Sequence, residues 1–320
     1  MFLFLILGYT KLLIGLGLFD SGNTSTVEII DLETSSSTCS DLPDFPFFGR
    51  DSIFGLNFQD NPMMCGSNDP VNNTDCFYFD NGLWNPSQPL TENRFSSGFS
   101  ASPYPKVKSK IFVTGGGHNG TLSPISSAEL LTDKGWESVA SPLPTPLQYH
   151  CMVLLNSTTV MAIGGRDNIT TANTYLLNTE INEWIEGPPL SQNRYQHSCG
   201  RIRKSKESSK FEIIVVGGFN GSDLSSVEIF DAETSAWRAG ASLPIPITDA
   251  VLVEDPTGGV ILVGGRSKIS ELDPAPLDTL FRLAHAEADH WQEMPQKLKS
   301  GRRYHSAFLI PNENVDCSFH

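Results

Sequence analysis

Glycine-rich stretches are the residues of this sequence that most resemble a chemical motif. VTGGGHNG begins at Val113, and the similar stretches IGGRDN and VVGGFNG begin at Ile163 and Val215. A glycine-rich turn binds phosphate when it leads into a helix and is followed by Lys and by Ser or Thr. None of the three stretches continues in that way. The pattern therefore predicts a structural role for these glycines and not a nucleotide site.

Arginines that precede apolar segments form a second candidate set. They are Arg50, Arg94, Arg194 and Arg303. A guanidinium group binds a carboxylate through two parallel hydrogen bonds, so arginines that converge would hold an acidic ligand. The alternative is that each arginine braces its own loop by donating to backbone carbonyl groups. The sequence is compatible with both roles.

Three histidines, His150, His197 and His305, lie at one place in a repeating pattern, each within two residues after a tyrosine. Imidazoles that converge can bind a metal ion, but a histidine in this context is more simply a buried structural residue. No HExxH segment, nucleophile elbow or zinc-type cysteine spacing occurs. We therefore expect no metal, no cofactor and no catalytic residue.

The charge of the chain argues against one class of partner. The 320 residues include 36 acidic and 22 basic side chains, which gives a formal net charge of −14. Nucleic-acid affinity depends on Lys and Arg that displace counterions from the phosphate backbone, so we expect no DNA or RNA partner. The 27 glycines and 21 prolines predict many turns between short elements.

A period near 50 residues organises the chain. The last glycines of successive apolar stretches are Gly17, Gly66, Gly116, Gly165, Gly218 and Gly265, at spacings of 47 to 53 residues. After all but the first, a tryptophan follows 18 to 26 residues later, and these are Trp84, Trp136, Trp184, Trp237 and Trp291. Such a fixed spacing is the signature of a repeat architecture.

Each period is predicted to form four short antiparallel strands. HSCGRI, FEIIVVGG, SSVEIFD and AWRAG, between His197 and Gly240, are the clearest set. Proline-rich links such as SPLPTP from Ser141 then lead to the next period. One such sheet cannot bury both faces alone, so the units are expected to pack radially around an axis.

A double glycine that ends the second strand, an acidic or apolar third strand and a tryptophan that opens the fourth together resemble the kelch repeat. The resemblance implies an all-β fold, a six-bladed kelch-like β-propeller with four antiparallel strands per blade. It also implies that the tryptophans pack between blades and that the repeat glycines are structural. These glycines are Gly17, Gly66, Gly115, Gly116, Gly164, Gly165, Gly217, Gly218, Gly264 and Gly265.

The two ends of the chain are predicted to meet in one blade. RRYHSAFLI, from Arg302, resembles a first strand that no second strand follows, and KLLIGLG, from Lys11, would be its partner. Kelch-like rings close in this way, with a C-terminal innermost strand. We therefore predict a single six-bladed propeller over residues 11–320, preceded by an apolar segment, residues 1–10, that is a candidate signal remnant. No transmembrane segment is expected in the mature chain, because Lys11 and several glycines interrupt the apolar run.

Cysteines and glycosylation sequons favour a secreted glycoprotein, with a cytoplasmic location as the alternative. The cysteines are Cys39, Cys65, Cys76, Cys151, Cys199 and Cys317, and the sequons begin at Asn23, Asn72, Asn119, Asn156, Asn168 and Asn220. Cys65 and Cys76 bracket a turn and are disulfide candidates, with reduced thiols as the alternative. Cys39 and Cys317 form a second candidate pair. The other two cysteines are expected to be small core residues in neighbouring innermost strands.

The resemblance favours a non-catalytic module that binds a protein or an acidic peptide. Related kelch propellers capture acidic segments with arginines around one mouth of the ring, where the four arginines and three histidines named above would lie. The first alternative is a sugar-active enzyme, because some kelch-like six-bladed propellers isomerise sialic acids in the central channel. The second is an intracellular kelch adaptor. A basic hairpin, Arg201 to Lys210, is predicted on the opposite face.

Overall fold

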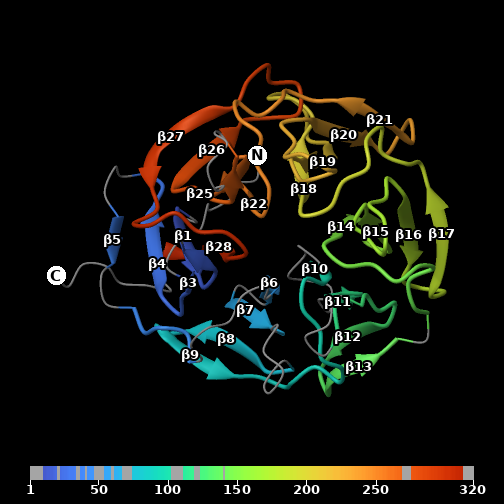
Figure 1. The fold of residues 1–320 in the computed structure, drawn as a ribbon, viewed down its shortest axis with the longest axis horizontal. Coiled ribbons are helices and arrows are strands. Elements are labelled where there is room, and N and C mark those ends of the chain that lie inside the picture. The colour runs from blue at the N-terminus through green and yellow to red at the C-terminus, as the bar shows by residue number, and fades with distance from the viewer. Residues whose placement is uncertain are drawn as a thin grey trace, which may run out of the picture.

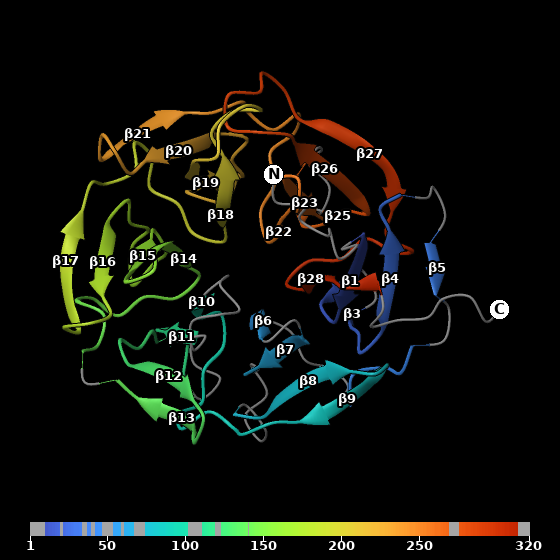
Figure 2. The same cartoon turned by 180° about the vertical axis from the view of Figure 1, so that it is seen from behind.

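The protein is a ring of β-sheets around a central axis (Figures 1 and 2). The computed structural model describes residues 10–19, 22–33, 37–39, 42–46, 54–58, 61–66, 74–101, 111–118, 123–139, 141–268 and 275–312. Six four-stranded antiparallel sheets lie within these ranges, and each forms one blade. The all-β, six-bladed propeller predicted from the repeat is therefore confirmed.

The blades are numbered here along the chain, and their strands are given from the axis outward. Blade 1 consists of β28 (Ser306–Ile310), β1 (Lys11–Gly15), β4 (Val27–Asp31) and β5 (Ser37–Cys39). Blade 2 consists of β6 (Phe54–Phe58), β7 (Asn61–Cys65), β8 (Cys76–Asp80) and β9 (Leu83–Pro86). Blade 3 consists of β10 (Gly98–Ala101), β11 (Ile111–Thr114), β12 (Ala128–Thr132) and β13 (Gly135–Ser138).

The second half of the ring repeats this order. Blade 4 consists of β14 (Cys151–Asn156), β15 (Thr159–Ile163), β16 (Thr174–Asn178) and β17 (Glu183–Gly187). Blade 5 consists of β18 (Ser198–Arg203), β19 (Phe211–Val216), β20 (Val227–Asp231) and β21 (Ala236–Ala239). Blade 6 consists of β22 (Val251–Glu254), β23 (Val260–Val263), β26 (Thr279–Leu283) and β27 (Gln292–Lys297). Two short ribbons, β2 (Leu18–Phe19) with β3 (Gly22–Asn23) and β24 (Arg266–Ser267) with β25 (Ala275–Pro276), follow the second strands of blades 1 and 6.

Blade 1 joins the two ends of the chain, as the unpaired first-strand pattern predicts. β28 pairs with β1 in the register Leu13 to Phe308, and β1 continues into β4. Leu12, Leu13 and Ile14 are completely buried because β1 has blades on both sides. Residues 1–9, which include most of the predicted apolar leader, lie outside the described ranges. No helix in the described ranges is long and apolar enough to cross a membrane.

The tryptophans hold neighbouring blades together. The indole N–H of Trp184 donates to the carbonyl of Ser141 at 3.1 Å, and that of Trp237 donates to the carbonyl of Pro188 at 2.8 Å. Trp291 repeats the contact with the carbonyl of Ala241 at 2.9 Å. Each acceptor belongs to the link that leads into the blade of its tryptophan. The hydrogen bond therefore fixes the link to that blade, while the apolar part of the indole packs against neighbouring side chains.

Two disulfides lie within the described residues. Cys65–Cys76 joins the paired strands β7 and β8, which confirms the predicted bridge. Cys151–Cys199 joins β14 to β18, so the expectation that these two residues are separate core thiols is wrong. Innermost strands of consecutive blades lie side by side at the axis, and the two Cα atoms are 6.0 Å apart, which is within disulfide reach. The side chains of the Cys39 and Cys317 pair lie outside the described part of the chain.

Candidate functional site

Five residues in the left-handed backbone region are joined in series by hydrogen bonds that run around the axis. They are Ser96, Tyr149, Gln196, Asp249 and Tyr304, with φ between 52° and 59°, each two residues before an innermost strand. The N–H of each of the last four donates to the carbonyl of the one before it, at 2.8 to 3.3 Å. We call this set the αL ring. Its geometry holds one side chain from each of five blades near the axis.

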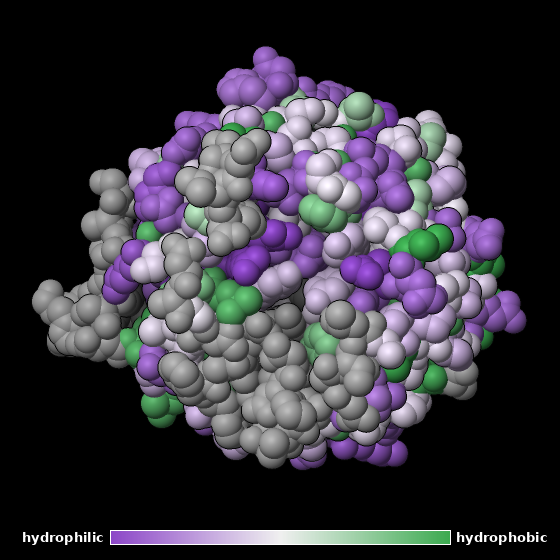
Figure 3. Space-filling view, in the orientation of Figure 1, coloured by the Kyte–Doolittle hydropathy of each residue, from purple (hydrophilic) through white to green (hydrophobic). Residues whose placement is uncertain are grey.

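The side chains of the αL ring form a polar and aromatic surface. The rings of Tyr149 and Tyr304, from blades on opposite sides, have centroids 6.5 Å apart, and Tyr195 lies 5.9 Å from Tyr149. The amide of Gln196 donates to the hydroxyl of Tyr304. Figure 3 shows one face of the ring, which is hollowed near its centre, with hydrophilic residues above and to the right of the hollow and some hydrophobic residues beside it.

Asp249 is the buried carboxylate of this cluster. Its side chain is 1% exposed, and its Oδ2 accepts a hydrogen bond from Arg266 Nε at 2.8 Å. Burial raises the pKa of Asp249 to about 6, although Arg266 and Arg303 both favour the charged form. Burial also raises the pKa of Tyr304, and the charge of Asp249 adds to this effect. The cluster therefore contains one carboxyl group that titrates near neutral pH.

Three partly exposed arginines belong to this part of the ring, and two of them, Arg266 and Arg303, act on the Asp249 carboxylate. Arg166 and Arg266 each follow the double glycine of their blade, and Arg303 precedes Tyr304. The guanidinium of Arg166 lies 5.1 Å from the ring centroid of Tyr195, and that of Arg303 lies 5.6 Å from that of Tyr304. Stacking on an aromatic face leaves the N–H groups at the edge of a guanidinium free to bind a carboxylate. We call Arg166, Arg266 and Arg303, together with the αL ring, the axial site.

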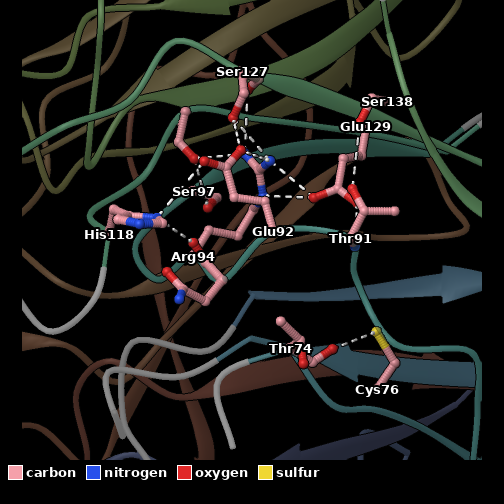
Figure 4. Close-up of polar contacts among 12 residues, drawn as sticks. Thr74, Cys76, Thr91, Glu92, Arg94, Ser97, His118, Ser127, Glu129 and Ser138 are labelled. Atoms are coloured by element: carbon pink, nitrogen blue, oxygen red, sulfur yellow. Dashed lines mark hydrogen bonds and ion pairs between the residues drawn. The ribbon is translucent and has the colours of Figure 1, made fainter. Parts of the chain in front are cut away.

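Two of the arginines predicted to bind a ligand are instead buried braces. Arg94 is completely buried, donates to the carbonyls of Gly115 and Ser127 at 2.9 and 3.2 Å, and pairs with Glu129 at 2.9 Å (Figure 4). Arg194 is also completely buried and repeats these contacts with Gly217, Ser226 and Glu228, at 2.8, 3.1 and 2.8 Å. The alternative offered by the sequence, that these arginines brace their loops, describes both residues.

The third brace is Arg302 and not its neighbour Arg303. Arg302 is buried, donates to the carbonyl of Leu16 at 3.3 Å and pairs with Glu28 at 2.6 Å. The sequence contains two adjacent arginines here, and the αL residue Tyr304 fixes which of them occupies the bracing position. Arg303 is thereby left at the axial site. Arg50 lies outside the described residues.

The three histidines fill the space against double glycines of the preceding blade. A Cβ on Gly164 would lie 2.9 Å from the ring of His197, and one on Gly264 would lie 2.9 Å from the ring of His305. Burial lowers the pKa of His150, His197 and His305 to about 3 in each case, and nearby arginines add to the effect. Glycine is required at these positions because the backbone φ is also positive. The part of the chain that the structure describes contains no cluster of side chains able to hold a metal ion.

The basic hairpin on the opposite face has carboxylate partners for most of its charges. Arg201 pairs with Glu254 at 2.8 Å, and Lys204 lies 3.3 Å from Asp231. Lys210 Nζ donates to Glu233 at 2.5 Å. This pairing lowers the net charge that the hairpin presents to an anionic partner.

Comparisons with known proteins agree with the observed repeat. The family model described as the Kelch motif matches residues 212–244, which run from β19 past Trp237. The other blades repeat the same four strands, and most repeat the double glycine and the tryptophan. The chain is a kelch-repeat β-propeller. Its sequence is 24% identical over 173 residues to Kelch-like protein 25 of Xenopus tropicalis, an alignment that covers 53% of this chain and 27% of that protein.

Two further comparisons set the limits of the likeness. The Kelch repeat and BTB domain-containing protein 12 of Danio rerio is 32% identical over 131 residues, which are 35% of this propeller and 20% of that protein. The chain thus spans about a quarter of the length of these relatives. The solved structure of YjhT superimposes with a TM-score of 0.68 over 89% of this propeller and 94% of that chain, at 13% identity, which is a likeness of fold alone.

Sequence reasoning missed several residues of the axial site. Arg166 and Arg266 stand in GGR triplets, so a signal was present in the residue that follows each double glycine. Gln196 and Asp249 gave no such signal, because the residue in the αL ring differs in all the described blades except two, where it is tyrosine. Only the backbone geometry identifies these positions as equivalent.

Proposed function

We propose that this kelch propeller binds a carboxylate-bearing segment of a partner protein at the axial site. The observation that carries the proposal is that Arg166 and Arg303 lie over tyrosine rings and form no ion pair with any residue in the described ranges. Arginines that are partly exposed and stacked on aromatic rings are suited to a carboxylate ligand. The propeller class to which the chain belongs commonly binds proteins.

We infer further that the ligand is slim and that the protein is secreted. Disulfides are typical of oxidising compartments, and the described chain contains two. Asn168 and Asn220 begin sequons on turns that follow β15 and β19, on the face of the axial site, and Asn168 is exposed. Glycans at these positions would narrow the approach to the axis. An intracellular adaptor would lack such glycans, so glycan analysis of native protein separates the two locations.

A binding measurement with a defined probe tests the proposal. A terminally capped hexa-aspartate peptide is expected to bind, and the matching hexa-asparagine peptide is expected not to bind, as measured by fluorescence polarisation. Arg166→Gln and Arg303→Gln should each weaken binding about tenfold, because each removes one charged hydrogen-bonding group. Arg238→Gln, on the outer strand β21, is the matched control and should leave the affinity unchanged. Equal binding of both peptides would refute the proposal.

A sugar-active enzyme is the second candidate, and Asp249 is the observation that favours it. A carboxyl group with a pKa of about 6 beside the hydroxyl of Tyr304 is suited to moving a proton. The test is the rate of anomer exchange of a sialic acid, followed by NMR. Acceleration by the protein that Asp249→Asn abolishes would establish the enzyme, whereas a rate equal to that of buffer would exclude it.

A further inference from the structure

The guanidinium of Arg266 is bonded to a buried carboxylate on one edge and is partly exposed to solvent. Its Nε donates to Asp249, which occupies one edge of the group. The Arg266 side chain is 18% exposed, and its other guanidinium nitrogens donate to no acceptor in the described residues. The fork formed by these nitrogens is the edge that binds carboxylates in bidentate fashion. A ligand carboxylate at this fork would therefore lie close to Asp249, with the same guanidinium between them.

Asp249 is incompletely neutralised before any ligand arrives. Its Oδ1 is buried, and besides Arg266 a hydrogen bond with Tyr304 favours its charged form. Arg266 is its one ion-pair partner in the described residues, and Arg303 acts on it only through longer-range charge. A second carboxylate at Arg266 would add the repulsion of a like charge to the existing cost of burial. Both effects favour the protonated, neutral form of Asp249.

We propose that the axial site takes up a carboxylate together with a proton, and that Asp249 accepts the proton as the ligand binds to Arg266. This inference rests on the proposed function. The bound state then contains a ligand carboxylate, the Arg266 cation and a neutral Asp249, so the net charge at this guanidinium is the same before and after binding. The consequence is that the ligand binds more tightly as the pH falls through the mildly acidic range.

Other charged and titratable groups face Asp249 from neighbouring segments. From the segment before β28, the charge of Arg303 favours the ionised form of Asp249, and burial raises the pKa of Tyr304. Tyr149, before β14, lies against Tyr304. Asp223, on the turn before β20, acts on Arg266 and accepts a hydrogen bond from the N–H of Lys268 at 3.1 Å. The pKa of about 6 leaves Asp249 ionised at pH 8 and half-protonated near pH 6.

Calorimetry with the hexa-aspartate peptide tests the inference on the intact protein. The affinity is expected to rise about 30-fold from pH 8 to pH 6, with about one proton taken up at pH 7 in buffers of different ionisation enthalpy. Asp249→Asn mimics the protonated form, so it should bind at pH 8 as tightly as the parent binds at pH 6, with no proton uptake. Asp223→Asn is the control on the same face and should keep the pH dependence. Thermal denaturation verifies that both variants fold.

Each outcome separates the inference from the function on which it rests. Peptide binding that is independent of pH, without proton uptake, would overturn the inference and leave the proposed function intact. A pH dependence that persists in a folded Asp249→Asn protein would also overturn it, because another group would then supply the proton. Absence of binding at every pH would refute the proposed function itself.

Discussion

The junctions between blades share one backbone arrangement, but some contain an apolar pair of side chains and others contain a buried ion pair. In blades 4 and 6, Leu147 and Ile247 occupy the position that Arg194 and Arg302 occupy in blades 5 and 1. In all four the carbonyl accepts a hydrogen bond from the second glycine of the preceding blade, at 2.8 to 2.9 Å. The residues opposite them are Tyr175 and Phe281 in the apolar blades, and Glu228 and Glu28 in the braced blades.

The difference shows that the backbone hydrogen bonds and glycines define the junction, whereas the side chains only have to fill it. A buried ion pair loses the free energy of hydration of both charges. The attraction between the charges and the hydrogen bonds from the arginine to backbone carbonyls offset this cost. Two apolar side chains gain by leaving water and need no partner. The two solutions should therefore tolerate substitution very differently, although their folds coincide.

The largest expected effect follows from breaking one brace. Arg194→Leu leaves Glu228, whose side chain is 5% exposed, without its counter-charge and should lower the free energy of unfolding by about 3–5 kcal/mol. Urea denaturation followed by tryptophan fluorescence measures the change. Leu147→Met, a volume-conserving change at the equivalent apolar position, is the control and should cost less than about 1.5 kcal/mol. Equal losses in both variants would contradict the comparison.

The second expected effect is a loss of folding stability in acid, caused by equivalent histidines in both kinds of blade. His150 lies in an apolar blade and His197 in a braced one, and burial lowers the pKa of each from 6.5 to about 3. Between these values the unfolded chain binds protons that the folded chain does not. Each histidine therefore stabilises the fold above pH 6.5 and loses about 1.4 kcal/mol of that stability per pH unit as the pH falls towards 3.

Denaturation midpoints measured from pH 7 to pH 4 test this slope. His197→Asn should reduce the slope by the contribution of one histidine, and His150→Asn should reduce it equally if the kind of blade is irrelevant. Asp249 acts in the opposite sense, since its folded pKa of about 6 lies above the ordinary value of 3.8. Its stabilising contribution is present below pH 3.8 and is lost as the pH rises through 6, so it offsets part of the histidine slope. A slope that neither histidine variant changes would contradict the assignment.

The smallest expected effect comes from converting a braced blade into an apolar one. The pair Arg194→Leu and Glu228→Tyr copies the residues of blade 4 into blade 5. Because no uncompensated charge remains, the free energy of unfolding of the double variant should lie within about 1 kcal/mol of that of the parent protein. It should be well above that of Arg194→Leu alone. The same urea titration measures it. A double variant as unstable as Arg194→Leu alone would show that the two junctions are not interchangeable.

The sequence predicts the repeat well and the axial site poorly, and the reasons are physical. Strands, double glycines and tryptophans recur because every blade must bury the same faces, so periodicity carries this information. The Cys151–Cys199 bridge depends on the lateral distance between two innermost strands, which no spacing along the chain encodes. The sequence analysis selected Arg303 and not Arg302 because the two arginines are adjacent, and a shift of one residue decides which side chain is buried.

Closure of the ring by β28 has a consequence for biosynthesis. About 290 residues separate Gly15 from its partner Ser306, so the inner edge of β1 has no partner until these residues have also been synthesised. At roughly 5–20 residues per second, that interval lasts on the order of tens of seconds. An unpaired strand edge of this kind is a template for pairing with another chain. The protein is therefore more vulnerable to aggregation during its synthesis, before β28 pairs with β1, than after the ring has closed.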